Sequence, residues 1–303
     1  MSNQIKLQGI YTFSKFRTDK NGKEIPETRK STKPFKNLIL DTGLDALGSS
    51  SITSLLTRCY VGGGGSTPAA SQSSLDAPIA ETFSIIENAS VQETSDAPFY
   101  VGTVRTYRFN QGEAQGNLTE VGVGDLSTLF SRALILDSNG DPTTFTVLED
   151  EVLDVTYELR LIVDATPVEG VISINIDGTP TDYNYSVIPS TLSASSWAFS
   201  NGFGSSGASP VAYSGEPGSA TGVPSGSQAS GSGSTPVVEN QQSTRSVTFG
   251  LTQGNVPGGI RTIRLGIGVT IWQIRFGSVA NDDPIPKTDT QSFTINFTAG
   301  WSR

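Results

Sequence analysis

The sequence predicts a mostly β fold, made of one or more antiparallel β-sandwich-like domains with an N-terminal β-hairpin, one short helical segment and a long Gly/Ser-rich loop. Three observations support this class. The 303 residues include 33 glycines but only 16% charged residues, a composition that suits many short strands joined by turns. Apolar and polar side chains alternate along many segments, as in strands with one buried face. Helix signals are confined to one region near the N-terminus.

The N-terminal residues predict a strand followed by a hairpin turn. Ile5, Leu7, Tyr11 and Phe13 share one face of a period-two pattern. The turn signal is Asn-Gly at positions 21 and 22, where both residues tolerate a positive φ. Residues 5–30 are therefore expected to form a β-hairpin with a cationic tip. Its basic residues are Lys15, Arg17, Lys20, Lys23, Arg29 and Lys30.

The next segment carries the best helix signal. Thr42 or Asp41 could cap its N-terminus, Leu44 and Leu47 lie three apart on one face, and Gly48 is a plausible stop. A weaker helical stretch covers residues 52–58. The glycines at 62–65 resemble a phosphate-binding loop only superficially, because Ser66 stands where such a loop needs lysine. A mobile or tightly turned loop is the favoured interpretation.

Strand signals dominate most of the remaining chain. In residues 152–163, Val155, Tyr157, Leu159 and Leu161 share one face while polar residues occupy the other, as in an antiparallel sheet with one wet side. The other expected strands cover residues 99–109, 118–123, 130–136, 145–148, 171–176, 183–188, 247–251, 260–276 and 292–297. Trp301 suggests that the last strand is packed rather than frayed.

One long segment has a different composition. Residues 200–236 contain nine glycines and eleven serines, and Glu216 is their only charge. Such a segment buries little apolar surface to offset its ordering entropy. It is expected to be a flexible loop, ordered, if at all, by neighbouring chains.

The division into domains follows from these features. We expect a basic N-terminal hairpin or arm in residues 1–36 and a β-sandwich-like domain with the short helix in residues 37–165. Residues 166–303 supply further strands and the Gly/Ser-rich insertion. They could form a second domain or complete the same sandwich, so one mixed sandwich and two domains split near Asp164 both remain open.

The chain has no histidine and a single cysteine, Cys59. Histidine titrates near neutral pH and is the commonest metal ligand, so histidine-based catalytic triads and histidine-bound zinc are excluded. One cysteine forms neither an intramolecular disulfide nor a four-cysteine metal site. The sequence therefore predicts a structural or binding protein with no enzyme activity, cofactor or metal.

Two groups of acidic residues and the aromatic residues are the remaining candidates for metal binding, catalysis or sugar binding. Asp137, Asn139 and Asp141 alternate as calcium ligands do, but the glycine and glutamate of an EF-hand are out of place, which favours a hairpin turn. Residues 149–154 contain four carboxylates. Two of them could be the facing carboxylates of a glycosidase. The favoured interpretation is that they lie at the solvated start of a strand and face a basic partner. The tryptophans and the strand tyrosines could line a sugar site, but core packing is favoured.

Charge is distributed unevenly. Residues 1–36 hold nine Lys or Arg against three Asp or Glu, a balance of +6, and residues 37–303 have a balance of −15. The basic hairpin could be a solvated surface, a docking element for an acidic neighbour, or, less favoured beside so acidic a body, a nucleic-acid contact. No signal peptide and no membrane-spanning stretch are expected.

Several segments together resemble a family of virion structural proteins of tailed bacteriophages, the tail or tail-fibre-like proteins. The matching stretches are residues 35–45, 61–68, 116–124, 129–137, 151–157, 285–288 and 297–303. The resemblance implies a virion protein of the tail, baseplate or tail fibre, assembled in the bacterial host cytoplasm. None of the matching segments carries catalytic chemistry.

The expected function is therefore that of a non-enzymatic structural protein. Its expected partners are other virion proteins and copies of itself, as a trimer or hexamer, with no nucleic acid and no membrane. A capsid decoration protein, or a fibre module that binds a host receptor or saccharide and exposes Trp197, is the alternative. The basic hairpin would dock a partner through its lysines and arginines together with the apolar face of Ile5, Leu7, Tyr11 and Phe13, because exposed ion pairs alone contribute only about 0–1 kcal/mol.

Overall fold

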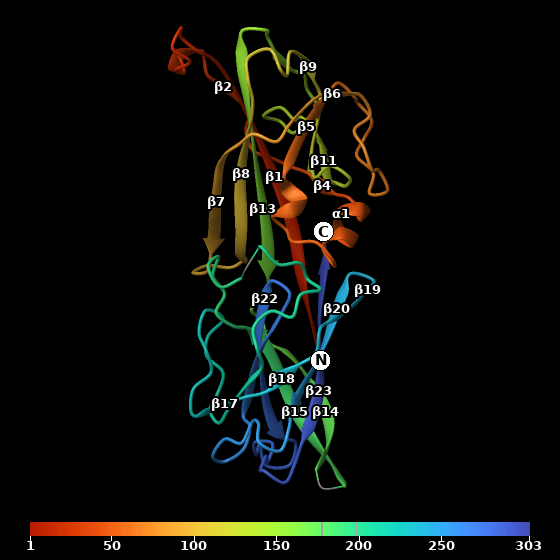
Figure 1. The fold of residues 1–303 in the computed structure, drawn as a ribbon, viewed down its shortest axis with the longest axis vertical. Helices are drawn as coiled ribbons and strands as arrows, with labels where there is room; N and C mark the ends of the chain where they lie inside the picture. The colour runs from red at the N-terminus through yellow and green to blue at the C-terminus, as the bar shows by residue number, and fades with distance from the viewer. Residues whose placement is uncertain (177, 198) are drawn as a thin grey trace.

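The chain folds into two β-sandwich halves stacked end to end (Figure 1). This computed structural model describes residues 1–303 except 177 and 198. The upper half in Figure 1 is built mainly from residues 2–163 and the lower half mainly from residues 168–302. The mostly β, antiparallel, sandwich-like class predicted from the sequence is confirmed.

One sheet runs through both halves. It has ten strands in the described residues, and seven of them follow the order β18-β20-β23-β1-β13-β8-β7, while β19 pairs with β20, and β2 and β3 pair with β1. Their bounds are β18 Ser232–Gly233, β20 Gln242–Phe249, β23 Phe293–Ser302, β1 Ser2–Arg17, β13 Glu151–Val163, β8 Phe99–Phe109, β7 Ile85–Glu93, β19 Val237–Glu239, β2 Lys30–Ser31 and β3 Phe35–Lys36. A short 3-10 turn, η1 (Pro26–Thr28), precedes β2.

A second sheet covers the upper half, in the order β4-β11-β10-β5-β6. Its strands are β4 Leu38–Ile39, β11 Leu129–Leu134, β10 Glu120–Gly124, β5 Arg58–Gly62 and β6 Pro78–Thr82. A small ribbon of β9 (Gly116–Leu118) and β12 (Phe145–Val147) closes the far end. The predicted helical region forms α1 (Asp41–Ala46) and the 3-10 turn η2 (Ser54–Leu56).

The lower half has its own facing sheet, in the order β14-β15-β22-β21-β16-β17. Its strands are β14 Val168–Ile176, β15 Thr179–Pro189, β22 Thr270–Ser278, β21 Thr262–Ile267, β16 Val211–Tyr213 and β17 Gln228–Ser230. Trp272 joins the two layers, with ring-centroid distances of 5.9 Å both to Phe297 of β23 and to Trp197. All three tryptophans therefore lie in the core.

Strand β1 is not the separate arm expected for residues 1–36. From Ile5 to Arg17 it pairs antiparallel with β13, and from Ser2 to Lys6 it pairs parallel with β23. Its alternating apolar side chains are buried as the periodicity predicted. Gly9 interrupts that apolar face because a Cβ there would collide with Tyr157 Oη and Asn37.

The chain ends are packed at the junction of the two halves. Trp301 of β23 stacks on Phe203 with ring centroids 4.6 Å apart, and its Nε1 donates to the Leu44 carbonyl of α1 at 2.8 Å. The amide of Phe203 donates to the Leu47 carbonyl at 2.8 Å. The prediction that the last strand is packed is thus confirmed. The chain passes from the upper to the lower half close to Asp164, and the two halves share the ten-stranded sheet. The predicted cap of α1 is wrong in detail, because Leu40 is the N-cap and Thr42 Oγ1 donates to the Leu129 carbonyl.

The Gly/Ser-rich segment 200–236 has a defined path within its own chain, so the expectation of a flexible loop ordered by neighbours is wrong. It supplies β16, β17 and β18. The buried Gln273 donates from Nε2 to the carbonyls of Gly218 and Ser219 at 3.2 and 2.9 Å and accepts from the Gly218 amide at 2.9 Å. The composition of residues 200–236 could not reveal this ordering, because the Gln273 side chain that binds the segment lies outside it in the sequence.

We expect Gln273→Leu to loosen residues 214–226 selectively. The substitution removes the hydrogen bonds to Gly218 and Ser219, each of which contributes about 0.5–1.5 kcal/mol. Hydrogen–deuterium exchange followed by mass spectrometry should show faster exchange in this segment and little change in β13. Gln242→Leu, on an exposed face of β20, is the matched control. Equal effects of the two variants would contradict this role of Gln273.

Candidate interaction surfaces

The first candidate surface is the end of the N-terminal hairpin, which projects from the upper half (Figure 1). Residues 18–36, which run from the end of the hairpin back to β3 beside Tyr11, are named the basic tip. The predicted turn is confirmed: Asp19 Oδ1 accepts from the amides of Asn21 and Lys23 at 2.9 Å each, and Gly22 has a φ of 77°. The tip is therefore a hydrogen-bonded turn rather than a loose loop.

The apolar residues predicted to dock a partner are buried in the chain's own core. Ile5, Leu7, Tyr11 and Phe13 are all 0–2% exposed. Tyr11, for example, lies 4.7 Å from Tyr157 between ring centroids and bonds Ser131 Oγ of the opposite sheet at 2.9 Å. The expectation of an apolar docking face here is wrong. Periodicity correctly identified a buried face, but it cannot say which sheet covers it.

Three of the predicted docking cations are also engaged within the chain. Lys15 pairs with Glu151 at 2.8 Å, Arg17 with Asp150 at 2.8 Å, and Arg29 with Glu24 at 2.6 Å. The acidic stretch at 149–154 therefore does face a basic partner, and that partner is strand β1 of the same molecule. Burial alone would raise the pKa of Glu151, but hydrogen bonds from Lys15 and the Leu148 amide hold it below its ordinary value.

The remaining cations of the tip are free. Among the described residues, no ion pair involves the exposed lysines Lys20, Lys23, Lys30, Lys33 and Lys36. The first three were predicted as docking residues. Lys33 and Lys36 were not, although their place in the basic N-terminal segment was a signal for them. The tip thus presents a concentrated positive charge beside an otherwise acidic protein.

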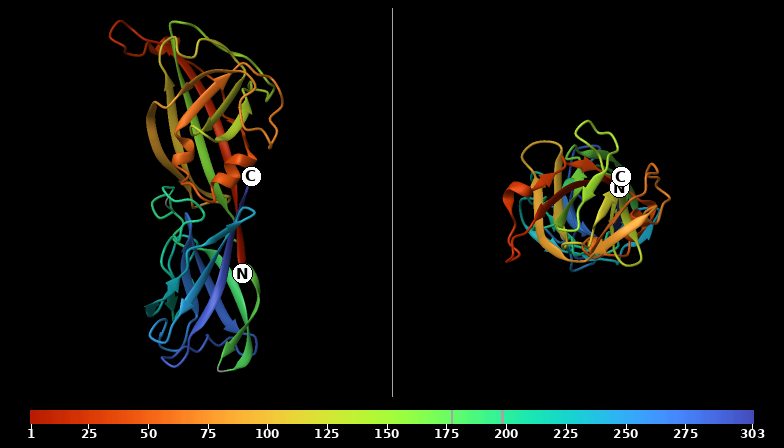
Figure 2. Two further views of the ribbon diagram at one scale, coloured as in Figure 1. Left: turned by 45° about the vertical axis from the view of Figure 1, so that its right-hand side comes forward. Right: turned by 90° about the horizontal axis from the view of Figure 1, so that it is seen from above.

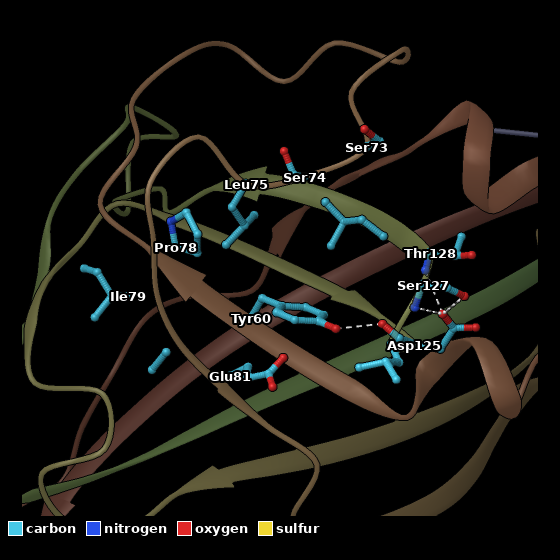
Figure 3. A pocket seen from close by; sticks show the side chains of 13 residues that line it. Tyr60, Ser73, Ser74, Leu75, Pro78, Ile79, Glu81, Asp125, Ser127 and Thr128 are labelled. Carbon is cyan, nitrogen blue, oxygen red and sulfur yellow. Dashed lines mark hydrogen bonds between the residues drawn. The ribbon is translucent and has the colours of Figure 1, made fainter.

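The second candidate surface is a groove on the outer face of the second sheet (Figure 3). It has a volume of about 460 Å³ and lies between the edge strand β6, the segment 73–75 and the turn 125–128 that joins β10 to β11. We name it the β6 groove. Its apolar lining comes from Tyr60, Leu75, Pro78, Ile79, Ala80, Leu126 and Leu129. Tyr60 spans it, donating its hydroxyl to the Asp125 carbonyl at 2.6 Å.

A buried ion-pair network fixes the segment that walls this groove. Arg132, which is 0% exposed, contacts Glu120 at 2.8 Å and Asp76 at 2.7 Å, and donates to Gln72 Oε1 at 2.8 Å. Glu120 in turn accepts from the amides of Gly64 and Ala77 at 3.0 and 2.8 Å. The glycine-rich loop is therefore tightly turned around a carboxylate. Its amides point at Glu120 and Asp76, so the phosphate interpretation has no place here.

The rim of the β6 groove is unusually apolar. Leu126 is 78% exposed, the highest fraction among large apolar side chains in the described part of the chain, and Ile79 is 45% exposed. Phe83, which is 74% exposed, lies just after β6 and outside the lining of the groove. Leu126 is held outward by a rigid turn, in which Asp125 Oδ1 accepts from the amides of Ser127 and Thr128 at 2.7 Å. Within the described residues β6 pairs only with β5, so its outer edge is open. No pattern in the sequence predicted this groove.

The other sequence candidates have structural roles. Asp137 accepts from the amides of Asn139 and Asp141 within a hairpin turn, as predicted. Arg108 donates two hydrogen bonds of 2.8 Å to the carboxylate of Asp154, so this carboxylate belongs to a structural ion pair. Cys59 is free and buried, and its burial raises the pKa of the thiol. In the described residues, no cluster of His, Cys, Asp or Glu has the arrangement of a metal site.

No family model, curated protein or solved structure matches this chain. Among the described residues, none of the helices has the length and apolar character needed to span a membrane. The basic tip and the β6 groove are therefore the candidate functional features of the chain.

We expect Arg132→Met to destabilise the fold strongly. It leaves Glu120 buried without its cation, and breaking a buried pair typically costs about 3–5 kcal/mol. Urea unfolding should show this loss, together with faster proteolysis of residues 63–77. Arg17→Met, at the exposed Arg17–Asp150 pair, should cost less than about 1 kcal/mol. A similar loss in both variants would contradict the role of the network.

Proposed function

We propose that the protein is a non-enzymatic structural component of a tailed-bacteriophage virion, in the tail, baseplate or tail fibre, where it assembles with copies of itself and with other virion proteins. The proposal rests on which charged and apolar groups already have partners within the chain and which do not. Three of the four carboxylates at 149–154 are paired with the chain's own arginines and lysines, while a basic tip and an apolar-rimmed groove remain open. The sequence resemblance to tail and tail-fibre-like proteins gives the virion context.

The two open surfaces suit assembly by subunit addition. Exposed apolar side chains beside an open strand edge are typical of protein–protein contacts. The five free lysines favour an acidic partner and would mainly increase the association rate and fix its orientation. Because exposed ion pairs contribute little, most of the binding free energy would have to come from apolar burial, which the groove rim can supply.

The two alternative functions, a capsid decoration protein and a receptor-binding fibre module, are not equally compatible with these surfaces. A capsid decoration protein would use the same surfaces, so only its location separates it from a tail component. The receptor-binding alternative placed Trp197 and the Gly/Ser-rich segment at an exposed tip, whereas Trp197 is 0% exposed against Trp272. That alternative has therefore lost the feature that motivated it.

The direct test is to locate the protein in purified particles. Immunogold labelling at one end of the tail, with mass spectrometry showing several copies per particle, is the expected result. Labelling on the head would favour the decoration alternative. Absence of the protein from particles would refute the proposal.

The basic tip is expected to be needed for incorporation. Deleting residues 1–36 is unsuitable because it removes β1 from the central sheet. Lys20→Gln, Lys23→Gln and Lys30→Gln combined change only exposed side chains and should lower the number of copies per particle several-fold at unchanged thermal stability. Lys6→Gln, an exposed lysine of β1 outside the tip, is the control. Normal incorporation of the triple variant would show that the tip does not dock.

A further inference from the structure

We propose that the basic tip of one copy seats in the β6 groove of a neighbouring copy, so that subunits join side by side. This inference rests on the proposed function, because it names a second copy of the chain as the partner of the tip. Three features support the inference: the two sites have complementary charges, both present apolar surface, and they lie on opposite sides of one molecule.

The charges of the two surfaces are complementary. The tip carries free lysines at positions 20, 23 and 30. The groove carries the carboxylates of Glu81, whose side chain is 50% exposed and pairs with Arg58 at 3.1 Å, and of Asp125, which has no ion pair among the described residues. Burial, followed by the negative charges of Glu81 and Asp125, raises the pKa of Tyr60 in the groove despite the opposing effect of Arg58. Because Arg58 offsets the charge of Glu81, the net negative charge of the groove comes from Asp125.

Apolar surface is available on both sides. The groove presents Leu126 and Ile79 at its mouth, with the exposed Phe83 at the end of the same edge strand. In the tip, Ile25 and Pro26 lie between the lysines at 23 and 30, and Pro26 is exposed. A cavity of about 460 Å³ is within the usual range of binding pockets, about 300–1,000 Å³, and can accept a pair of such side chains.

The tip is already ordered for binding. Arg29 holds Glu24 through two hydrogen bonds of 2.6 Å, and its guanidinium lies 4.5 Å from the centre of the Phe16 ring. The Thr28 hydroxyl closes the turn by donating to the Ile25 carbonyl at 2.6 Å. A preorganised segment loses less conformational entropy on binding than a flexible one.

The positions of the two surfaces favour contacts between copies. Seen along the long axis, the tip and the segment that walls the groove project on opposite sides of the upper half (Figure 2), and Figure 1 shows the same separation. A molecule cannot insert its tip into its own groove in this arrangement. Two different surfaces that bind each other in successive copies generate a closed ring or an open helical array, which is the kind of assembly that the proposed function requires.

Cross-linking of two single-cysteine variants tests the contact directly. Lys23→Cys in the tip and Ser127→Cys at the groove mouth are made separately and mixed under mild oxidation. The native Cys59 is fully buried and does not compete. A disulfide-linked dimer that requires both variants is expected. Lys23→Cys mixed with Ser138→Cys, an exposed turn position of the same half, is the control, and equal dimer yield in both mixtures overturns the proposal.

A charge exchange provides the second test. Lys23→Glu or Glu81→Lys alone should weaken self-association by about five-fold, the most that an exposed ion pair supplies. The combination of both in one chain should restore it, as measured by analytical ultracentrifugation at low salt. Failure of the combined variant to recover overturns the contact.

The failure of this inference can be told apart from failure of the proposed function. If tip variants reduce incorporation into particles but no tip–groove cross-link forms, the tip binds another virion protein, and only the self-association is overturned. If the protein is absent from particles, the proposed function fails as well, whatever the cross-linking shows.

Discussion

The structure depends on the pairing of one strand, β1, with partners from both halves. It forms antiparallel pairs with β13 along the upper half and parallel pairs with the end of β23. A buried backbone must have its amide and carbonyl groups bonded, so β1 cannot leave the sheet without exposing both neighbours. The C-terminal Trp301 is consequently held against α1, and the two halves form one continuous body instead of two domains on a linker.

This constraint also explains why the basic tip projects. Strand β1 extends beyond the upper core, where Lys15 and Arg17 meet the acidic start of β13. These internal pairs neutralise two cations at the root of the hairpin, while unpaired lysines remain at its end, at positions 20 and 23, and on the returning segment, at positions 30, 33 and 36. The uneven charge of the sequence therefore has two roles. Part of it fastens the hairpin to the body, and the exposed lysines remain available to a partner.

The groove depends on a different interaction, the burial of Arg132 with two carboxylates. Buried charges need excellent geometry and additional hydrogen bonds to offset their desolvation, and Glu120 supplies these by binding the amides of the 63–77 segment. The segment is thereby folded over the outer face of the sheet without covering it completely. The gap that remains, beside an open strand edge and an outward Leu126, is the surface that a partner can use.

The sequence by itself located several long strands, such as those near 99–109 and 152–163, and the turns at Asp19–Gly22 and Asp137–Asp141, because side-chain alternation and turn chemistry are local properties of the chain. It also identified the basic hairpin, including three of its free lysines. It did not locate β6 or β7, and the single strand expected over residues 260–276 is the pair β21 and β22. Only the tertiary structure decided that the face of Ile5 and Tyr11 packs against the chain's own second sheet, that Gln273 orders the Gly/Ser-rich segment, and that the β6 groove exists. Each of these depends on residues 50 or more positions apart in sequence, and such pairings are set by the register and packing of whole sheets, which no local pattern encodes.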